Sequence, residues 1–185
     1  MYEYHITVAG DADRFVDWCH MNQVKPLFID LNEIKGKGLQ KQLQCTFKSC
    51  SHDDPRAQEY KDSLFTKGFE VLRVKCETHP EADILIERND WPIYWEAHGY
   101  ILTNDIIRLK SLLPGWAKIS FNRFSAQQDG KNKYWITVRH SDWQVVDLYL
   151  NAVNIILSNN NYKISEFKME AVLIDTNKEL DDGWI

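Results

Sequence analysis

The chain of 185 residues is 44% hydrophobic and 26% charged, and its formal net charge is −5. This composition is typical of a soluble globular protein, and the negative charge argues against an extended nucleic acid as a partner, because such binding depends on neutralising phosphates. No apolar run reaches the roughly 18 residues of a membrane span, and the N-terminal residues do not resemble a signal peptide. The four cysteines have no Cys-x-x-Cys spacing, so we expect reduced thiols and a cytoplasmic protein without a membrane partner.

The first part of the chain predicts four strands and two helices. Polar and apolar residues in alternation indicate strands, and apolar residues three and four positions apart indicate helices. Asp11 or Asp13 can cap the first helix, and Asp53-Asp54-Pro55 starts the second, which stops at Gly68. In chain order we expect a strand at 2–9, a helix at 11–22, strands at 26–31 and 42–49, a helix from 55 to 68 and a strand at 69–77.

The second part predicts the same order of elements. Residues 79–92, with two prolines and several acids, form the expected linker, and 176–185 form an acidic tail in which we expect Trp184 to dock. A capping box at 141–144 opens the longer helix of this part. We expect a strand at 93–102, a helix at 103–113, strands at 118–124 and 134–140, a helix from 141 to 159 and a strand at 162–174.

Four polar motifs occur twice in the chain, and the distance in sequence between the two copies is almost the same for each motif. Glu3-Tyr4-His5 is matched 93 positions later by Glu96-Ala97-His98. The other pairs, at offsets of 91, 93 and 92, are Thr46-Phe47-Lys48 with Thr137-Val138-Arg139, Lys75-Cys76-Glu77 with Lys168-Met169-Glu170, and Asp30 with Asn122. The offset is about half the chain length, and the motifs keep the same character from one half to the other. This pattern indicates two copies of one structural unit.

The predicted fold class is therefore α+β, with two tandem ferredoxin-like halves of order βαββαβ at 1–78 and 93–175. A pseudo-twofold axis relates the halves, and each is an antiparallel sheet with its helices on one face. The first and third strands are neighbours at the centre of such a sheet, so the Glu-x-His and Thr-x-Lys or Thr-x-Arg motifs should lie side by side on the face without helices. If these faces meet, the cleft between the halves is the candidate site.

Histidines are the candidate acid and base in that cleft. His5 and His98 can reach either protonation state at neutral pH because an ordinary histidine has a pKa near 6.5. Glu3 and Glu96, two residues away on the same face, are expected to orient the imidazoles or raise their pKa. Hydroxyl groups and cations would hold a phosphoryl group, an arginine through two parallel hydrogen bonds. The candidate ligand-binding residues are Thr46, Lys48, Thr137, Arg139, Lys75, Lys168 and Asn122.

A pair of ferredoxin-like lobes with one histidine each resembles the two-histidine phosphoesterases, which include RNA and cyclic-nucleotide phosphodiesterases. Their signature is His-x-Thr or His-x-Ser in each lobe, on a later strand than the first. His5-Ile6-Thr7 matches the tripeptide, whereas Tyr100 stands at the hydroxyl position of the second copy. The resemblance implies that His5 and His98 form the acid and base pair and that Thr7 binds phosphate.

Other interpretations stay open at this point. The repeated motifs could form a solvated sheet face with cross-strand ion pairs, or the two Glu-x-His motifs could bind a divalent metal, which Lys48 and Arg139 would repel. The cluster of Trp91, Trp95, Trp135 and Trp143 is expected to form a core between the halves rather than a base-stacking platform.

The leading prediction is a metal-independent phosphoesterase or phosphodiesterase that needs no cofactor and acts on a nucleotide or cyclic phosphate. The alternatives are a non-catalytic module that captures a nucleotide or another small anionic ligand, and a structural or protein-interaction domain.

Overall fold

The computed structural model describes residues 1–31, 41–80, 92–125 and 127–181. The first part of the chain contains β1 (Tyr2–Ala9), α1 (Ala12–Met21), β2 (Lys25–Leu31), β3 (Lys41–Ser49), α2 (Arg56–Thr66) and β4 (Glu70–Thr78). The second part contains β5 (Tyr94–Thr103), α4 (Ile106–Leu112), β6 (Lys118–Asn122), η1 (Arg123–Ser125), β7 (Gln127–Gln128), β8 (Lys131–His140), α5 (Trp143–Asn159), β9 (Lys168–Asp175) and η2 (Lys178–Asp181).

The helix ends follow local side-chain chemistry. The Asp11 carboxylate accepts a hydrogen bond from the backbone N–H of Arg14 at the start of α1, and Asp142 accepts one from Gln144 at the start of α5. After α2, Gly68 has φ +83°, the left-handed conformation in which glycine commonly ends a helix. Asp142 caps α5, so the cap lies one residue later than the expected box, whose first residue is Ser141.

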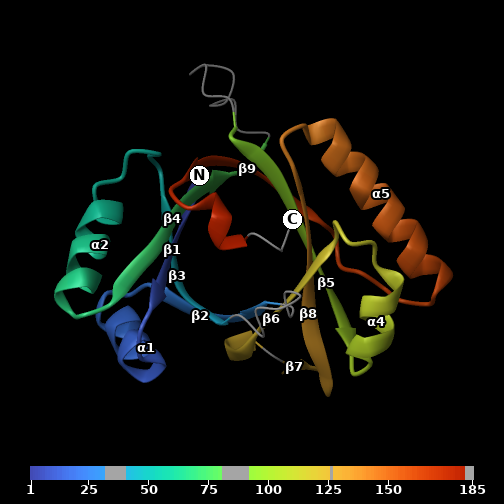
Figure 1. Ribbon diagram of the computed structural model, residues 1–185, viewed down its shortest axis with the longest axis horizontal. Helices are drawn as coiled ribbons and strands as arrows, with labels where there is room; N and C mark the ends of the chain where they lie inside the picture. Colours follow the sequence, from blue (N-terminus) through green and yellow to red (C-terminus); the bar gives the residue numbers. More distant parts are fainter. Residues whose placement is uncertain (32–40, 81–91, 126, 182–185) are drawn as a thin grey trace.

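The strands of both halves form one closed antiparallel barrel. Neighbouring strands follow the order β5-β9-β4-β1-β3-β2-β6-β8, and β8 pairs with β5 to close the ring, while β7 extends the edge of β8. Figure 1 shows this ring of strands around a central opening, with α1 and α2 outside it on one side and α4 and α5 outside it on the other.

The predicted fold class, with two separate ferredoxin-like sheets facing each other, is therefore wrong. The strands that would be the free edges of the two sheets pair across the halves, β2 with β6 and β4 with β9. An unpaired sheet edge leaves backbone N–H and C=O groups without partners, and closing the ring satisfies them. The polar faces consequently point into one barrel interior instead of lining a cleft between two lobes.

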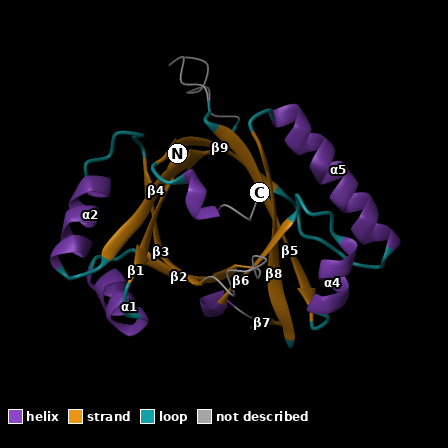
Figure 2. Ribbon diagram, in the orientation of Figure 1, coloured by secondary structure: helices purple, strands orange, loops and turns teal. Residues whose placement is uncertain are grey.

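Apolar residues lie on the outside of the barrel wall, under the helices. On one side Phe15 and Trp18 of α1 and Leu64 of α2 pack against β1 residues such as Ile6. On the other side the buried residues of α5, among them Val146, pack with those of β5 and β8. Figure 2 shows α1, α2, α4 and α5 on the outer side of the labelled strands, whereas the short helix η2 lies across the central opening in this view. Since strand residues alternate between faces, the residues between these apolar ones point inward.

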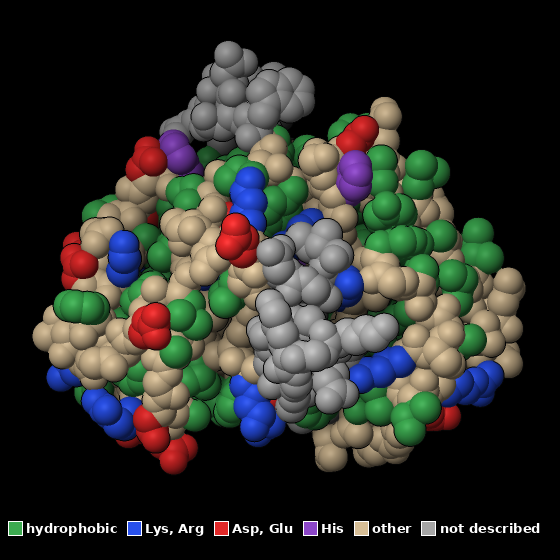
Figure 3. Space-filling view, in the orientation of Figure 1, with side chains coloured by type: hydrophobic (Ala, Val, Ile, Leu, Met, Phe, Trp, Pro, Cys, Tyr) green, Lys and Arg blue, Asp and Glu red, His purple; other side chains and the backbone are tan. Residues whose placement is uncertain are grey.

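The outer surface carries mixed charge. In Figure 3 acidic and basic side chains are interspersed over one face, with hydrophobic side chains between them. None of the helices in the described part of the chain is long and apolar enough to cross a membrane. The expected docking of Trp184 and most of the expected linker at 79–92 lie outside the described residues.

Candidate functional site

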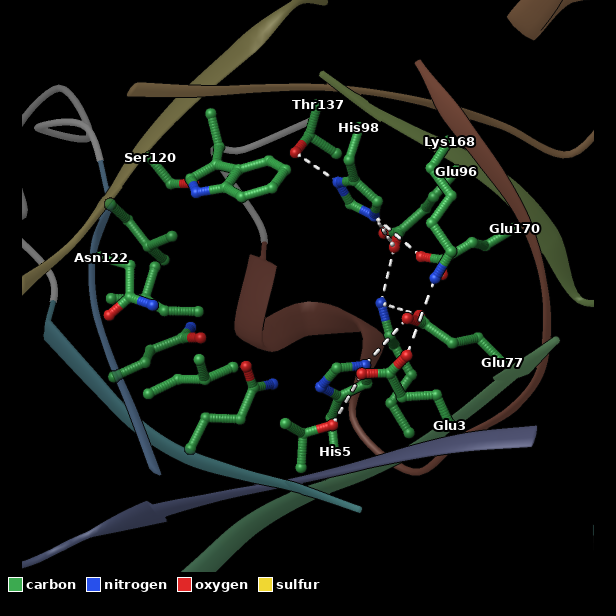
Figure 4. Close-up of a pocket in the computed structure, with 18 of the residues that line it drawn as sticks. Glu3, His5, Glu77, Glu96, His98, Ser120, Asn122, Thr137, Lys168 and Glu170 are labelled. Atoms are coloured by element: carbon green, nitrogen blue, oxygen red, sulfur yellow. Dashed lines mark hydrogen bonds and ion pairs between the residues drawn. The ribbon is translucent and has the colours of Figure 1, made fainter. Parts of the chain in front are cut away.

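The barrel encloses a cavity of about 370 Å³. Figure 4 shows its side chains converging from strands around the ring. Ten of the twelve candidate residues from the sequence line it, namely Glu3, His5, Thr46, Lys75, Glu96, His98, Asn122, Thr137, Arg139 and Lys168. The structure thus brings together both Glu-x-His motifs, inside the barrel.

The other two candidates do not line the cavity. Thr7 is fully buried, and its hydroxyl accepts a hydrogen bond from Gln44 Nε2 at 3.3 Å. Lys48 is exposed near the end of β3, opposite Glu3 in the strand register. Neither residue is therefore placed to bind a ligand within the cavity.

One wall of the cavity is strongly charged. All four glutamates of the lining, Glu3, Glu77, Glu96 and Glu170, come from the adjacent strands β1, β4, β5 and β9. Register places Glu3 opposite Glu77 and Glu96 opposite Glu170, so like charges face each other across each strand pair. Cations between the carboxylates are required to hold such an arrangement together.

Two lysines join the halves through equivalent contacts. Lys75 Nζ lies 2.6 Å from an oxygen of Glu77 and 2.6 Å from an oxygen of Glu96. Lys168 pairs with Glu170, and its Nζ lies 3.7 Å from Glu3 Oε2. Each lysine contacts the glutamate two residues ahead of it and the Glu-x-His glutamate of the other half. The Lys168 side chain is 55% exposed, so its partners can exchange, whereas Lys75 is buried.

Glu96 is the centre of the charged wall. Its carboxylate contacts Lys75, Arg139 and His98 although the residue is only 1% exposed. Burial opposes ionisation, but the positive charges of Lys75 and Arg139 hold the pKa of Glu96 well below its usual range. The guanidinium of Arg139 also lies over the ring of Tyr94, 4.4 Å from its centroid.

His5 is held by Glu77. The distance from His5 Nε2 to Glu77 Oε1 is 2.8 Å. Burial opposes ionisation of Glu77, yet Lys75 and His5 keep its pKa well below the usual value, so the carboxylate can only accept a hydrogen bond. The proton of a neutral His5 therefore sits on Nε2. The other nitrogen, Nδ1, is buried and has no hydrogen-bond partner among the described residues.

His98 lies between carboxylates. Its Nε2 is 3.4 Å from Glu96 Oε2 and 3.5 Å from Glu170 Oε2, and its Nδ1 is 2.8 Å from Thr137 Oγ1. Burial disfavours the imidazolium, but contact with Glu96 and the charge of Glu170 raise the pKa of His98 above its ordinary value. The two histidines therefore differ in their contacts, since both ring nitrogens of His98 have partners and Nδ1 of His5 has none among the described residues.

The opposite wall contains residues that the sequence analysis did not select. The lining side chains of β2, β3, β6 and β8 include no carboxylate, and Gln42, Gln44, Ser120 and Trp135 are among them. Asn122 also lies here, but its side-chain oxygen accepts hydrogen bonds from the backbone N–H groups of Phe28 and Phe124. The alternation of side chains between the two faces of β8 predicts that Trp135 points the same way as Thr137 and Arg139.

The tryptophan core expected between the halves is not observed among the described residues. Trp135 lines the cavity, Trp95 packs against the outer core of the second half, and Trp143 is 51% exposed at the start of α5. Trp91 lies outside the described residues.

The cavity lining carries more positive than negative charge. Six Lys or Arg side chains and four Glu side chains lie among the described residues that line it. Arg73 is matched by Asp175 at 2.7 Å, outside the lining. Lys25 and Lys133 have no carboxylate within ion-pair distance in the described parts of the chain, and Lys133 Nζ instead lies 3.9 Å from the ring centroid of Tyr100. These two lysines were not among the sequence candidates.

The metal alternative gains no support from the residues that the structure describes. Within them, no group of three or more His, Cys, Asp or Glu side chains is arranged to hold a metal ion. The cations beside Glu96 and Glu77 occupy the positions where an ion would bind these carboxylates.

Comparisons with known proteins do not assign the chain to a family. No family model matches it, and no curated protein matches it. Among solved structures, the small subunit of acetolactate synthase from Thermotoga maritima is similar, with 12% identity, 95% of each chain covered and a TM-score of 0.31. A likeness at this TM-score establishes neither a shared fold nor a shared function. Function must therefore be argued from the site itself.

Proposed function

We propose that the barrel interior binds a small anionic ligand, a nucleotide or cyclic nucleotide, and that His5 and His98 transfer protons during hydrolysis of its phosphate ester. The observation that carries the proposal is that both histidines line one cavity, where one ring nitrogen of each lies beside a buried carboxylate. A volume of about 370 Å³ falls within the range of ligand pockets in proteins.

The charge of the cavity lining favours an anionic ligand, although the chain as a whole is negatively charged. The protein has a net charge of −5, whereas the cavity has six Lys or Arg and four Glu side chains among its described lining residues. Lys25 and Lys133 are the cations that a phosphate could pair with at once. Using Lys75 or Arg139 would require the ligand to displace Glu96, which is costly for a buried pair.

The contacts of the two imidazole rings suggest a separate role for each histidine. His5, with Nε2–H donated to the ionised Glu77, would accept a proton at Nδ1 from the attacking water or hydroxyl group. His98, whose pKa is raised, would give a proton to the leaving oxygen. Thr137 would keep the His98 ring in place through its contact with Nδ1. Glu77 orients the base in this account, a role that the sequence analysis gave to Glu3.

A non-catalytic binding protein is the second candidate. It is favoured by the ion pairs of Lys75, Arg139 and Lys168, which leave the charged wall largely satisfied without any reaction. The same cavity would then capture a nucleotide without converting it.

Product formation from linear, 2′,3′-cyclic and cyclic dinucleotides tests the proposal. We expect turnover of at least one substrate, and we expect it to persist in EDTA because the roles above need no metal. Thermal unfolding should be recorded on the same panel, since a ligand that binds the folded state raises the melting temperature. Stabilisation without product would support the binding protein, and neither product nor stabilisation would contradict both candidates.

A further inference from the structure

The wall of the cavity opposite the glutamates has its own chemistry. Its lining side chains come from β2, β3, β6 and β8 and combine aliphatic groups, amides, hydroxyl groups and one indole with the cations Lys25, Lys133 and Arg139, without a carboxylate. The amides and the indole suit a neutral, flat and polar group, and the lysines suit an anion beside it. This wall would therefore suit a ligand with an anionic end and an uncharged ring.

Gln42 supplies an unused donor on this wall. The residue is 5% exposed, and its Nε2 has no acceptor among the described residues. By contrast, the neighbouring inward residue Gln44 donates its Nε2 to Thr7 Oγ1. A buried donor without an acceptor is unfavourable, so a ligand acceptor that reached Gln42 would relieve that penalty in a site shielded from water.

Trp135 supplies a ring surface that is held in place. Tyr100 packs edge-on to it, with ring centroids 5.4 Å apart and planes at 61°. Lys133 Nζ lies 4.8 Å from the Trp135 ring centroid. These contacts fix the indole while it still lines the cavity, and a fixed aromatic ring is a suitable stacking partner for a flat heterocycle.

We infer that this wall is a subsite for a nitrogen heterocycle of the nucleobase class. The ring would stack on Trp135, and a ring nitrogen or carbonyl oxygen would accept a hydrogen bond from Gln42 Nε2. The inference rests on the proposed function only for the anionic end of the ligand, because the base subsite uses neither histidine.

Calorimetric titration with the four common nucleosides, with their 5′-monophosphates and with ribose 5-phosphate tests the subsite. We expect at least one nucleotide to bind about tenfold or more tightly than ribose 5-phosphate, as a single stacked base can provide this much. Trp135→Leu and Gln42→Leu should each weaken that nucleotide several-fold and leave ribose 5-phosphate unchanged. Trp143→Leu, on the outer surface, is the matched control and should change neither affinity.

The outcomes separate this inference from the proposed function. Equal affinity for nucleotides and ribose 5-phosphate would overturn the base subsite. Free nucleosides that bind in a Trp135-dependent way, while no phosphate compound is hydrolysed, would support the subsite and contradict the proposed hydrolysis. Absence of binding by all compounds to the wild-type protein would overturn the subsite. Gln42→Leu keeps the inference testable if Trp135→Leu fails to fold. The Gln42 amide nitrogen has no hydrogen-bond partner among the described residues, so its removal breaks no hydrogen bond that it donates to them.

Discussion

Replacing Glu96 with glutamine should lower the free energy of unfolding by about 3–5 kcal/mol. Glu96 is the shared partner of Lys75, Arg139 and His98 and is almost completely buried. Glutamine keeps the size of the side chain but removes the negative charge, so Lys75 is left with Glu77 and Arg139 loses its ion pair with Glu96. Denaturant unfolding at pH 7, with fluorescence and circular dichroism as probes, measures the loss.

Glu59→Gln on the exposed surface of α2 is the control and should change the free energy of unfolding by no more than about 0.5 kcal/mol. If Glu96→Gln were as stable as this control, the ion pairs of the charged wall would not hold the barrel together.

The pH dependence of stability follows from the same residues. Glu77 and Glu96 have pKa values below the ordinary 4.5 in the folded protein. The stability that they contribute is complete above about pH 4.5 and is lost as the pH falls from there through the depressed folded pKa values. For His98, whose folded pKa is raised above 6.5, the contribution is complete below pH 6.5 and is lost as the pH rises through the folded pKa.

The second large effect is on catalysis. His98→Gln should lower turnover by about 10²–10⁴-fold, the usual contribution of a general acid, because the glutamine amide is too weak an acid to protonate the leaving oxygen. Its affinity for substrate should change far less than its turnover, since Lys25 and Lys133 remain. Rates under saturating substrate and affinities by calorimetry separate the two effects.

His20→Gln is the matched control, because His20 is exposed on α1, outside the barrel. It should leave turnover unchanged. Equal turnover by His98→Gln and His20→Gln would remove His98 from the mechanism and leave the binding protein as the better account.

The repeated Glu-x-His motifs could be read as site residues because strand alternation is a local property. Residues at i and i+2 share a face, so the pairs Glu3 with His5 and Glu96 with His98 had to point the same way. The structure places these motifs beside the Thr-x-Lys and Thr-x-Arg strands, as the register of β1 with β3 and of β5 with β8 shows.

Barrel closure could not be predicted from the same pattern. It depends on pairing of β2 with β6 and of β4 with β9, which joins residues roughly 90 or more positions apart, such as Ile29 with Asn122. Alternation within a strand specifies which side chains share a face and does not specify the strand that lies at its edge.

Most residues of the wall without carboxylates were missed because they are not repeated. Gln42 and Gln44 of β3 correspond in register to Lys133 and Trp135 of β8, two positions that differ in chemistry between the halves. Identical residues at equivalent positions reveal only the features that both halves share. The residues that would recognise a particular ligand lie where the copies differ.

Histidine ring signals in NMR spectra test the central claim most directly, because each imidazole reports on its own surroundings. Each nucleoside 5′-monophosphate should be titrated into the wild-type protein, with signals assigned from single His→Gln variants. We predict that at least one nucleotide shifts the signals of His5 and His98 and leaves those of His20 and His140, on the outside of the barrel, unchanged. If every nucleotide leaves His5 and His98 unchanged, or shifts only the outer histidines, the cavity is not the ligand site.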